Sequence, residues 1–195
     1  MSAFITEWNM PAGSFTLPLR SPRSYDMQVD WGDGSPVSTV TSYNDPNATH
    51  EYTTAGTYQI SITGTCEAWY INNDSSIKDL LIKVIDWGSN GIKYDGYRYA
   101  FYGCTNLVEL PAGAITGIDG AYNYEAMFRG CTGLTSIPSG LFDNCPNANN
   151  FKHLFRDCTG LTSIPGAIFD NCPNLADFAF QYTFYGCSSL TEIPE

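Results

Sequence analysis

Positive charge is scarce in this chain. Nine lysines and arginines stand against twenty aspartates and glutamates, which gives a formal net charge of −11. Such a surface repels phosphate backbones and anionic lipids, so we expect neither nucleic-acid binding nor membrane-surface binding. The sequence also lacks an apolar run of the roughly 20 residues that a membrane helix needs, so we expect no membrane insertion.

A secretory leader is not evident either. The start, MSAFITEWNMPAG, has no basic region and no apolar region of the kind that a leader carries. Three interpretations follow: the chain stays in a cytoplasm, it leaves by another route such as cell lysis, or its leader has been removed.

The sequence also lacks recognisable motifs of metal sites and of catalytic sites. The chain has seven cysteines but no C-x-x-C pair, which zinc sites usually show. Its two histidines, His50 and His153, lie in no recognisable nucleophile–base frame. The acidic stretches YNDPN and NNDSS do not fit the D-x-D-x-D-G calcium loop, so calcium there is the less favoured interpretation. We predict no catalytic residue, no metal and no cofactor, and hence no enzyme.

The second half of the chain contains a repeat. A Phe-x-x-Cys frame begins at Phe101, Phe128, Phe155 and Phe184, with spacings of 27, 27 and 29 residues, and each frame continues as x-x-Leu-x-x-Leu/Ile-Pro. This period and spacing are typical of a leucine-rich-repeat solenoid. We therefore predict about four coils within residues 71–195, behind an N-terminal capping strand near 77–88. Each coil would bury its apolar residues on the next, as Leu134 on Leu161.

Six of the seven cysteines recur with this repeat. A buried thiol behaves as a small apolar side chain, and we favour that interpretation. Disulfides between neighbouring coils are the alternative, although stacked side chains run side by side and suit the geometry of that bond badly.

The frame Phe-x-x-Cys-x-x-Leu-x-x-Ile-Pro resembles the BspA-like leucine-rich repeats of bacterial surface proteins. The resemblance covers about residues 77–195, and the segments VIDWG at Val84 and YAFYGC at Tyr99 look like that family's entry into its repeats. It implies a binding or adhesion role and carries over no catalytic residue.

The first seventy residues alternate apolar and polar side chains instead, as in Tyr25, Met27 and Val29. The alternation and the turn signals between the runs predict strands near 3–8, 14–19, 25–31, 37–42, 50–53 and 57–65, in two sheets packed face to face. We expect Asp33 to close a turn through an Asx-type bond and His50 to stand at a strand start.

The stretches VDWGDGSPVS and HEYTTAGTYQISITG resemble the PKD-type immunoglobulin-like domain, over about residues 1–70. The Trp31–Gly34 hairpin is one residue shorter than that family's usual spelling. The resemblance implies a spacer or adhesive module. The predicted fold is therefore two-domain and mainly β, with a PKD-type β-sandwich over 1–70 followed by a short leucine-rich-repeat solenoid over 71–195.

The repeat stops at Pro194-Glu195, part-way through a coil. An open coil shows apolar side chains and unpaired edges, so we expect a partner to cover it, either another copy or a neighbouring subunit of an assembly. A shortened chain would also explain this end.

Three function classes compete. The favoured one is a phage virion protein, a capsid decoration or a tail-associated module that binds the host surface. The second is a bacterial cell-surface or secreted adhesin whose leader or anchor is absent, and the third is an enzyme. The expected ligand of the first two is a protein or glycan on a host or cell surface.

Two candidate binding surfaces follow from the repeat. The outward positions beside the predicted strands are Val108, Glu109, Thr135, Ser136, Thr162, Ser163, Thr191 and Glu192. The tyrosine-rich zone contains Tyr94, Tyr97, Tyr99, Tyr122 and Tyr124, and tyrosine supplies contact area at little entropic cost. For the first set the favoured alternative is that these are simply solvated strand residues, and half of the tyrosine rings are alternatively core.

Overall fold

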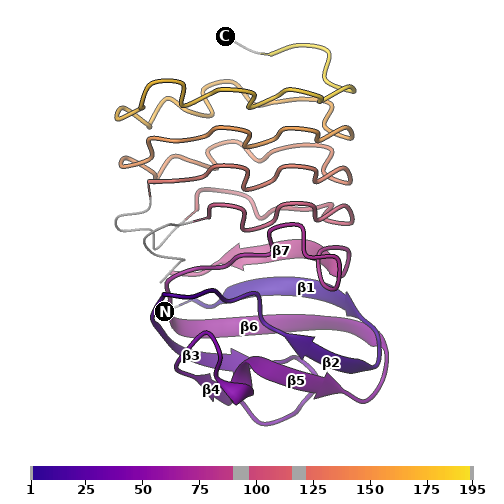
Figure 1. Cartoon of the computed structure of the whole chain (residues 1–195). Coiled ribbons are helices and arrows are strands. Elements are labelled where there is room, and N and C mark those ends of the chain that lie inside the picture. The colour runs from indigo at the N-terminus through magenta and orange to yellow at the C-terminus, as the bar shows by residue number, and fades with distance from the viewer. Residues whose placement is uncertain (1, 90–96, 116–121, 194–195) are drawn as a thin grey trace.

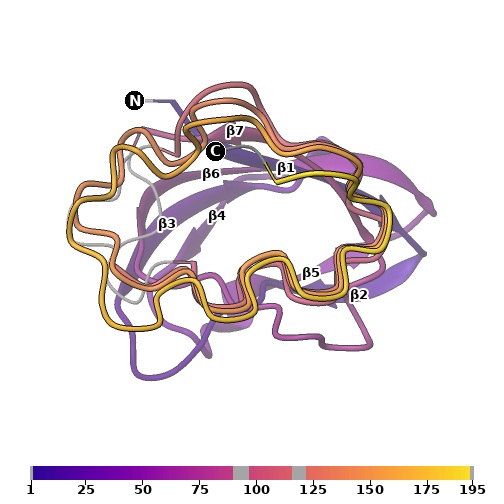
Figure 2. The ribbon, with the colours of Figure 1, turned by 90° about the horizontal axis from the view of Figure 1, so that it is seen from above.

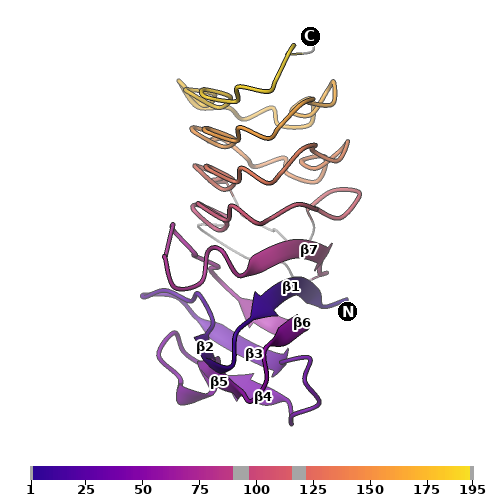
Figure 3. The same cartoon turned by 90° about the vertical axis from the view of Figure 1, so that its right-hand side faces the viewer.

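Figure 1 shows a base of β-sheets that carries a stack of layers. The structure is a computed structural model, and it describes residues 2–89, 97–115 and 122–193. Successive layers follow the chain away from the base (Figures 1 and 3), and seen from above their outlines superpose (Figure 2).

All strands of the described residues lie in the base. They are β1 (Phe4–Met10), β2 (Gly13–Thr16), β3 (Tyr25–Asp30), β4 (Ser38–Val40), β5 (Thr49–Tyr52), β6 (Gly56–Cys66) and β7 (Leu81–Trp87), with a 3-10 helix η1 (Pro46–Ala48) before β5. A five-stranded sheet has the order β4-β3-β6-β1-β7, and β2 pairs with β5 in a second sheet. Every pairing is antiparallel. The protein is thus mainly β, and the described residues contain no α-helix.

Side-chain alternation explains these strands. Along β3, Tyr25, Met27 and Val29 are buried while the residues between them are exposed. A strand turns successive side chains to opposite faces, so one face of the sheet becomes the core. The long β6 is the centre of the sheet and pairs with both β1 and β3.

The predicted fold class is wrong. The five-stranded and two-stranded sheets do not close into the expected immunoglobulin-like β-sandwich. The predicted leucine-rich-repeat solenoid is not found either, because no strand follows Trp87 in residues 97–115 and 122–193. Turns build these layers, whereas the predicted repeat requires a strand in each coil.

Backbone conformation is the physical reason for that difference. Residues on both sides of each central phenylalanine have a left-handed φ, as at Ala126 (54°) and Gly130 (71°) around Phe128. Extended strands do not contain such residues at this density. The chain therefore closes a turn at every second residue, for example Met127 N–H to the Tyr124 carbonyl (3.2 Å) and Cys131 N–H to the Phe128 carbonyl (3.1 Å).

The intervening N–H groups join one layer to the next. Ala126 N–H donates to the Lys152 carbonyl (2.9 Å), and Phe128 N–H donates to the Leu154 carbonyl (2.9 Å). We name the layers by their central phenylalanines Phe101, Phe128, Phe155 and Phe184. In every inner layer the alternate N–H groups point toward the following layer, so each interface has a donating side and an accepting side.

Aromatic rings and leucines fill the interior of the stack. The rings of Phe101 and Phe128 stack at 5.5 Å, those of Phe128 and Phe155 at 5.4 Å, and those of Phe155 and Phe184 at 5.8 Å. Leu134 and Leu161 are both fully buried. One hydrophobic cluster extends from the sheets through the layers.

The cysteines are part of this interior. All seven are buried free thiols, in agreement with the favoured interpretation and against the disulfide alternative. In the three layers that follow the first, the frame thiol donates to the phenylalanine carbonyl of the layer before it: Cys131 Sγ to Phe101 (3.2 Å), and Cys158 Sγ to Phe128 and Cys187 Sγ to Phe155, both at 3.0 Å. The recurring phenylalanine and cysteine therefore have a common role: the thiol of one layer forms a hydrogen bond with the phenylalanine carbonyl of the preceding layer.

Strand β7 joins the two parts of the molecule. On one side it pairs with β1, and on the other Val84 N–H donates to the Glu109 carbonyl (3.1 Å) while the Ile82 carbonyl accepts from Val108 N–H (3.0 Å). The strand expected near 77–88 is thus an edge strand of the five-stranded sheet and also the floor of the stack.

Candidate functional site: an arginine–tyrosine strip

Arginine and tyrosine side chains form a strip along the outside of the layers. All of them except Tyr70 lie at frame positions just before and after the central phenylalanine, whose ring points inward. The strip comprises Tyr70, Arg98, Tyr99, Tyr102, Glu125, Arg129, Lys152, His153, Arg156, Asp157, Tyr182 and Tyr185.

Cation–π contacts run from the base to the last layer. Arg98 lies 4.9 Å from the ring centre of Tyr99, Arg129 lies 5.1 Å from that of Tyr102, and Arg156 lies 5.0 Å from that of Tyr185. Ring contacts extend the strip at both ends: Tyr70 meets Tyr99 edge-on at 6.0 Å.

The far end of the strip lies around Tyr182. The His153 ring stacks on the Tyr182 ring at 5.3 Å, and Tyr182 meets Tyr185 edge-on at 5.8 Å. Burial, and then the positive charges of Arg156 and Arg129, lower the pKa of His153. This imidazole is therefore neutral at neutral pH and presents a flat ring.

Two carboxylates hold the arginines in place. Glu125 accepts from Arg98 Nε at 3.2 Å and from the Tyr99 hydroxyl at 3.0 Å. Asp157 makes ion pairs with Arg129 (3.6 Å) and with Arg156 (3.3 Å). Burial, and then the Glu125 charge, raise the pKa of Tyr99, so this hydroxyl stays protonated and donates. Such pairs fix the guanidinium planes against the rings.

The strip has an excess of positive charge. All four basic residues beyond position 96 belong to it, namely Arg98, Arg129, Lys152 and Arg156, and they outnumber its two carboxylates. The strip therefore carries a positive charge, whereas the chain as a whole has a net charge of −11. An anionic group approaching the protein would be directed to this strip.

The predicted tyrosine zone is only partly at the surface. Tyr97 and Tyr124 are fully buried and pack in the core, so they cannot contact a ligand and we remove them from the candidate site. Tyr99 is half-buried and belongs to the strip, and Tyr122 is 45% exposed. Tyr94 lies outside the described residues.

The other predicted surface is exposed along its length. We call it the threonine–serine face; it consists of Val108, Glu109, Thr135, Ser136, Thr162, Ser163, Thr191 and Glu192, all exposed. Thr162 donates to the Thr135 carbonyl through its N–H (3.0 Å) and its hydroxyl (3.1 Å). Its eight residues include two glutamates but no aromatic ring and no cationic side chain.

Sequence reasoning missed most of the strip. The signal was present at the variable positions of the frame, which read Y-A-F-Y-G, A-M-F-R-G, H-L-F-R-D and Y-T-F-Y-G around the phenylalanines. Knowing that the residue after each central phenylalanine points outward would have placed Tyr102, Arg129, Arg156 and Tyr185 in one row.

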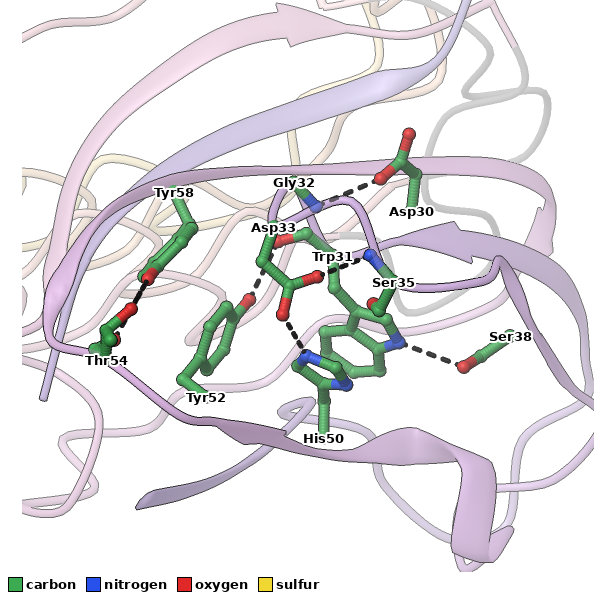
Figure 4. A network of polar contacts seen from close by, with 10 residues as sticks. All are labelled: Asp30, Trp31, Gly32, Asp33, Ser35, Ser38, His50, Tyr52, Thr54 and Tyr58. Carbon is green, nitrogen blue, oxygen red and sulfur yellow. Dashed lines mark hydrogen bonds and ion pairs between the residues drawn. The ribbon is translucent and has the colours of Figure 1, made fainter. Parts of the chain in front are cut away.

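A polar network in the base involves the motif residues Asp33 and His50 (Figure 4). Asp33 accepts from Ser35 N–H at 3.0 Å, as the Asx-type turn requires, and lies 2.8 Å from His50 Nε2 in β5. The His50 ring stacks on Trp31 at 4.8 Å. Contacts with Ser35, and then His50, lower the pKa of Asp33 to about 2.

This network is structural. The Tyr52 hydroxyl donates to the Trp31 carbonyl (2.9 Å), and Trp31 Nε1 donates to the Ser38 hydroxyl (2.9 Å). The polar groups thus tie the turn after β3 to β4 and β5. The predictions that Asp33 closes a turn and that His50 stands at a strand start are confirmed.

Among the described residues no group of three or more histidine, cysteine or acidic side chains is placed to hold a metal ion. The described residues also contain no helix of the length and apolarity needed to cross a membrane. Comparisons with protein-family models, with curated proteins and with solved structures found no match.

Proposed function

We propose that the protein is a non-enzymatic recognition module and that the arginine–tyrosine strip binds a carboxylate-bearing glycan. The observation that carries this proposal is the clustering of four cations among tyrosine rings in a strongly acidic chain. Guanidinium groups bind carboxylates in a fixed fork geometry. Ring faces of tyrosine suit the apolar faces of sugars.

The setting that we propose is a phage particle, as a capsid decoration or a tail-associated protein that binds the host surface. A bacterial cell-surface adhesin is the alternative, and the motif resemblances to BspA-like and PKD-type proteins support a surface role in either case. Quantitative mass spectrometry of purified particles and of cell-envelope fractions would separate the two settings.

Binding to immobilised glycans tests the recognition role. The double variant Tyr102→Ala/Arg129→Ala should lower affinity about tenfold or more, since a hydrogen bond to a charged group contributes about 1.5–3 kcal/mol. The matched control Thr135→Ala/Thr162→Ala on the threonine–serine face should leave affinity unchanged. Affinity for an acidic glycan should also fall between about 50 mM and 500 mM salt, because screening weakens attraction between exposed charges.

The reverse pattern would contradict the assignment. If the threonine variants lost binding and the strip variants kept it, the threonine–serine face would be the site. If protease treatment of the host cells abolished binding while glycan removal had no effect, the ligand would be a protein.

A further inference from the structure

Part of the arginine–tyrosine strip is a row of side chains that crosses the four layers. The residues directly after the central phenylalanines are, in successive layers, Tyr102, Arg129, Arg156 and Tyr185. Arg129 lies 5.1 Å from the ring centre of Tyr102, and Arg156 lies 5.0 Å from that of Tyr185. We call these four residues the axial row. It has two cations in the middle and an aromatic ring at each end.

One carboxylate serves both cations of the axial row. Asp157 lies 3.6 Å from Arg129 Nε and 3.3 Å from Arg156 Nε. Two guanidinium groups beside one carboxylate leave an excess of one positive charge at the middle of the row. The two arginine side chains are 29% and 28% exposed, so a ligand can reach them. Because each guanidinium has five N–H donors, the pair can bind a second carboxylate from solution.

Lys152 and three amide side chains lie beside this centre. Lys152 belongs to the same layer as Arg156, and no carboxylate of the described residues forms an ion pair with it. Together with Asn149, Asn150 and Gln181 it lines a groove of about 350 Å³. Amide groups both donate and accept hydrogen bonds, which matches the hydroxyl groups of a sugar. The strip thus borders a polar surface that suits a polyhydroxylated ligand.

Ring–cation contacts recur along the strip toward the base. Arg98 lies 4.9 Å from the ring centre of Tyr99, and Arg20 lies 4.7 Å from that of Tyr70. The central phenylalanine rings of neighbouring layers stack at 5.4–5.8 Å, which gives the length of one step along the stack. A single pyranose ring is comparable in length with one step. A ligand with one acidic sugar would therefore occupy only a small part of the strip.

We propose that the ligand of the strip is a linear polysaccharide of uronic acid units that lies along the stack and crosses successive layers. This inference rests on the proposed glycan-binding function and specifies its ligand. One carboxylate of the polysaccharide binds between Arg129 and Arg156, and the sugar units on either side of it lie against the rings of Tyr102 and Tyr185. An acidic peptide also carries carboxylates, but it offers no sugar faces to these rings.

Titration calorimetry of the whole protein with monomers and tetramers of galacturonic acid and of glucuronic acid tests the proposal. The tetramer of at least one of the two should bind at least about tenfold more tightly than its monomer, because linked units meet neighbouring layers at a high effective concentration. The fully methyl-esterified tetramer has the same length and no charge. It should bind at least about tenfold more weakly than the acid, because its charged hydrogen-bond acceptors are lost.

A variant at one end of the axial row tests its direction. Tyr185→Ala should reduce the ratio of tetramer affinity to monomer affinity by about threefold or more, because it removes one sugar-binding ring. Tyr185 is 58% exposed, so this substitution leaves the core unchanged. Tyr122→Ala is the matched control: Tyr122 is 45% exposed and lies outside the strip, so the ratio should stay at the wild-type value.

Three results would contradict the proposal. A monomer that binds as tightly as its tetramer, or a preference for a glycan with a single terminal acidic sugar, would overturn the polymeric ligand and leave the proposed glycan-binding function standing. Absence of binding to every acidic sugar would overturn both. Poly-glutamate or single-stranded DNA that bound as tightly as the tetramer would show attraction by charge alone and would overturn the polysaccharide ligand as well.

Discussion

At the scale of single residues, the interior of the stack is the most sensitive part of the protein. Leu134 and Leu161 are fully buried, one above the other in the repeat frame, and the adjacent Thr135 is exposed. Protein interiors pack at crystal-like density, so a lost side chain leaves a void that the layers cannot fill.

We expect Leu134→Ala to lower the free energy of unfolding by about 2–5 kcal/mol, which is the usual effect of such a cavity. Thr135→Ala is the matched control and should change it by less than about 0.5 kcal/mol. Denaturant titrations of both variants measure the difference. Equal effects of the two substitutions would show that Leu134 is not in the core.

The thiols allow a second prediction at this scale. Burial raises the pKa of Cys66 and of Cys145 to about 12, and raises those of Cys131 and Cys158 well above the usual value. The thiolate is the reactive form, so buried thiols with raised pKa values react slowly. Ellman's reagent at pH 8 should modify few thiols in the folded protein and all seven in guanidinium. Rapid modification of the native protein would contradict this burial.

At the scale of elements, the Asp33–His50 contact links the turn after β3 with β5. The folded-state pKa of Asp33, about 2, is below its ordinary value of 3.8. The contacts of this carboxylate with Ser35, and then with His50, therefore stabilise the fold above about pH 4, and this contribution is lost as the pH falls toward 2.

We expect the melting temperature of the wild type to fall between pH 4 and pH 2 more steeply than that of Asp33→Asn, which cannot titrate there. Asp26→Asn, on the exposed face of β3, is the control and should keep the wild-type slope. Parallel curves for wild type and Asp33→Asn would show that this carboxylate contributes no acid sensitivity.

At the scale of the whole molecule, the sheets and the layers share one hydrophobic cluster, and β7 belongs to both. A shared core makes cooperative unfolding the expected behaviour. The four tryptophans, Trp8, Trp31, Trp69 and Trp87, all lie in the base or in the connection to the stack. Six of the seven cysteines lie in the layers.

Tryptophan fluorescence and thiol accessibility therefore report on different ends of the molecule. We expect both to change at the same guanidinium concentration, in one transition. Two separated midpoints would show that base and stack unfold independently, as two domains would.

The sequence by itself determined where the strands of the base lie and which residues of the repeat are buried. Alternation at Tyr25, Met27 and Val29 predicted β3, and the recurrence of phenylalanine, cysteine and leucine predicted an interior that only stacking can bury. Those conclusions depend on burial of apolar side chains, which the order of residue types records directly.

Only the tertiary structure decided which partners the backbone N–H groups of the repeat have. Left-handed residues such as Ala126 and His153 divide the N–H groups between turns within a layer and bonds to the next layer. The left-handed conformation cannot be predicted from an alanine or a histidine in the sequence, because it is imposed by hydrogen bonds to the neighbouring layers. The stacking also brings Arg129 and Arg156 together at Asp157 on the outside of the layers, because the neighbours of a residue depend on which segment of the chain lies above it.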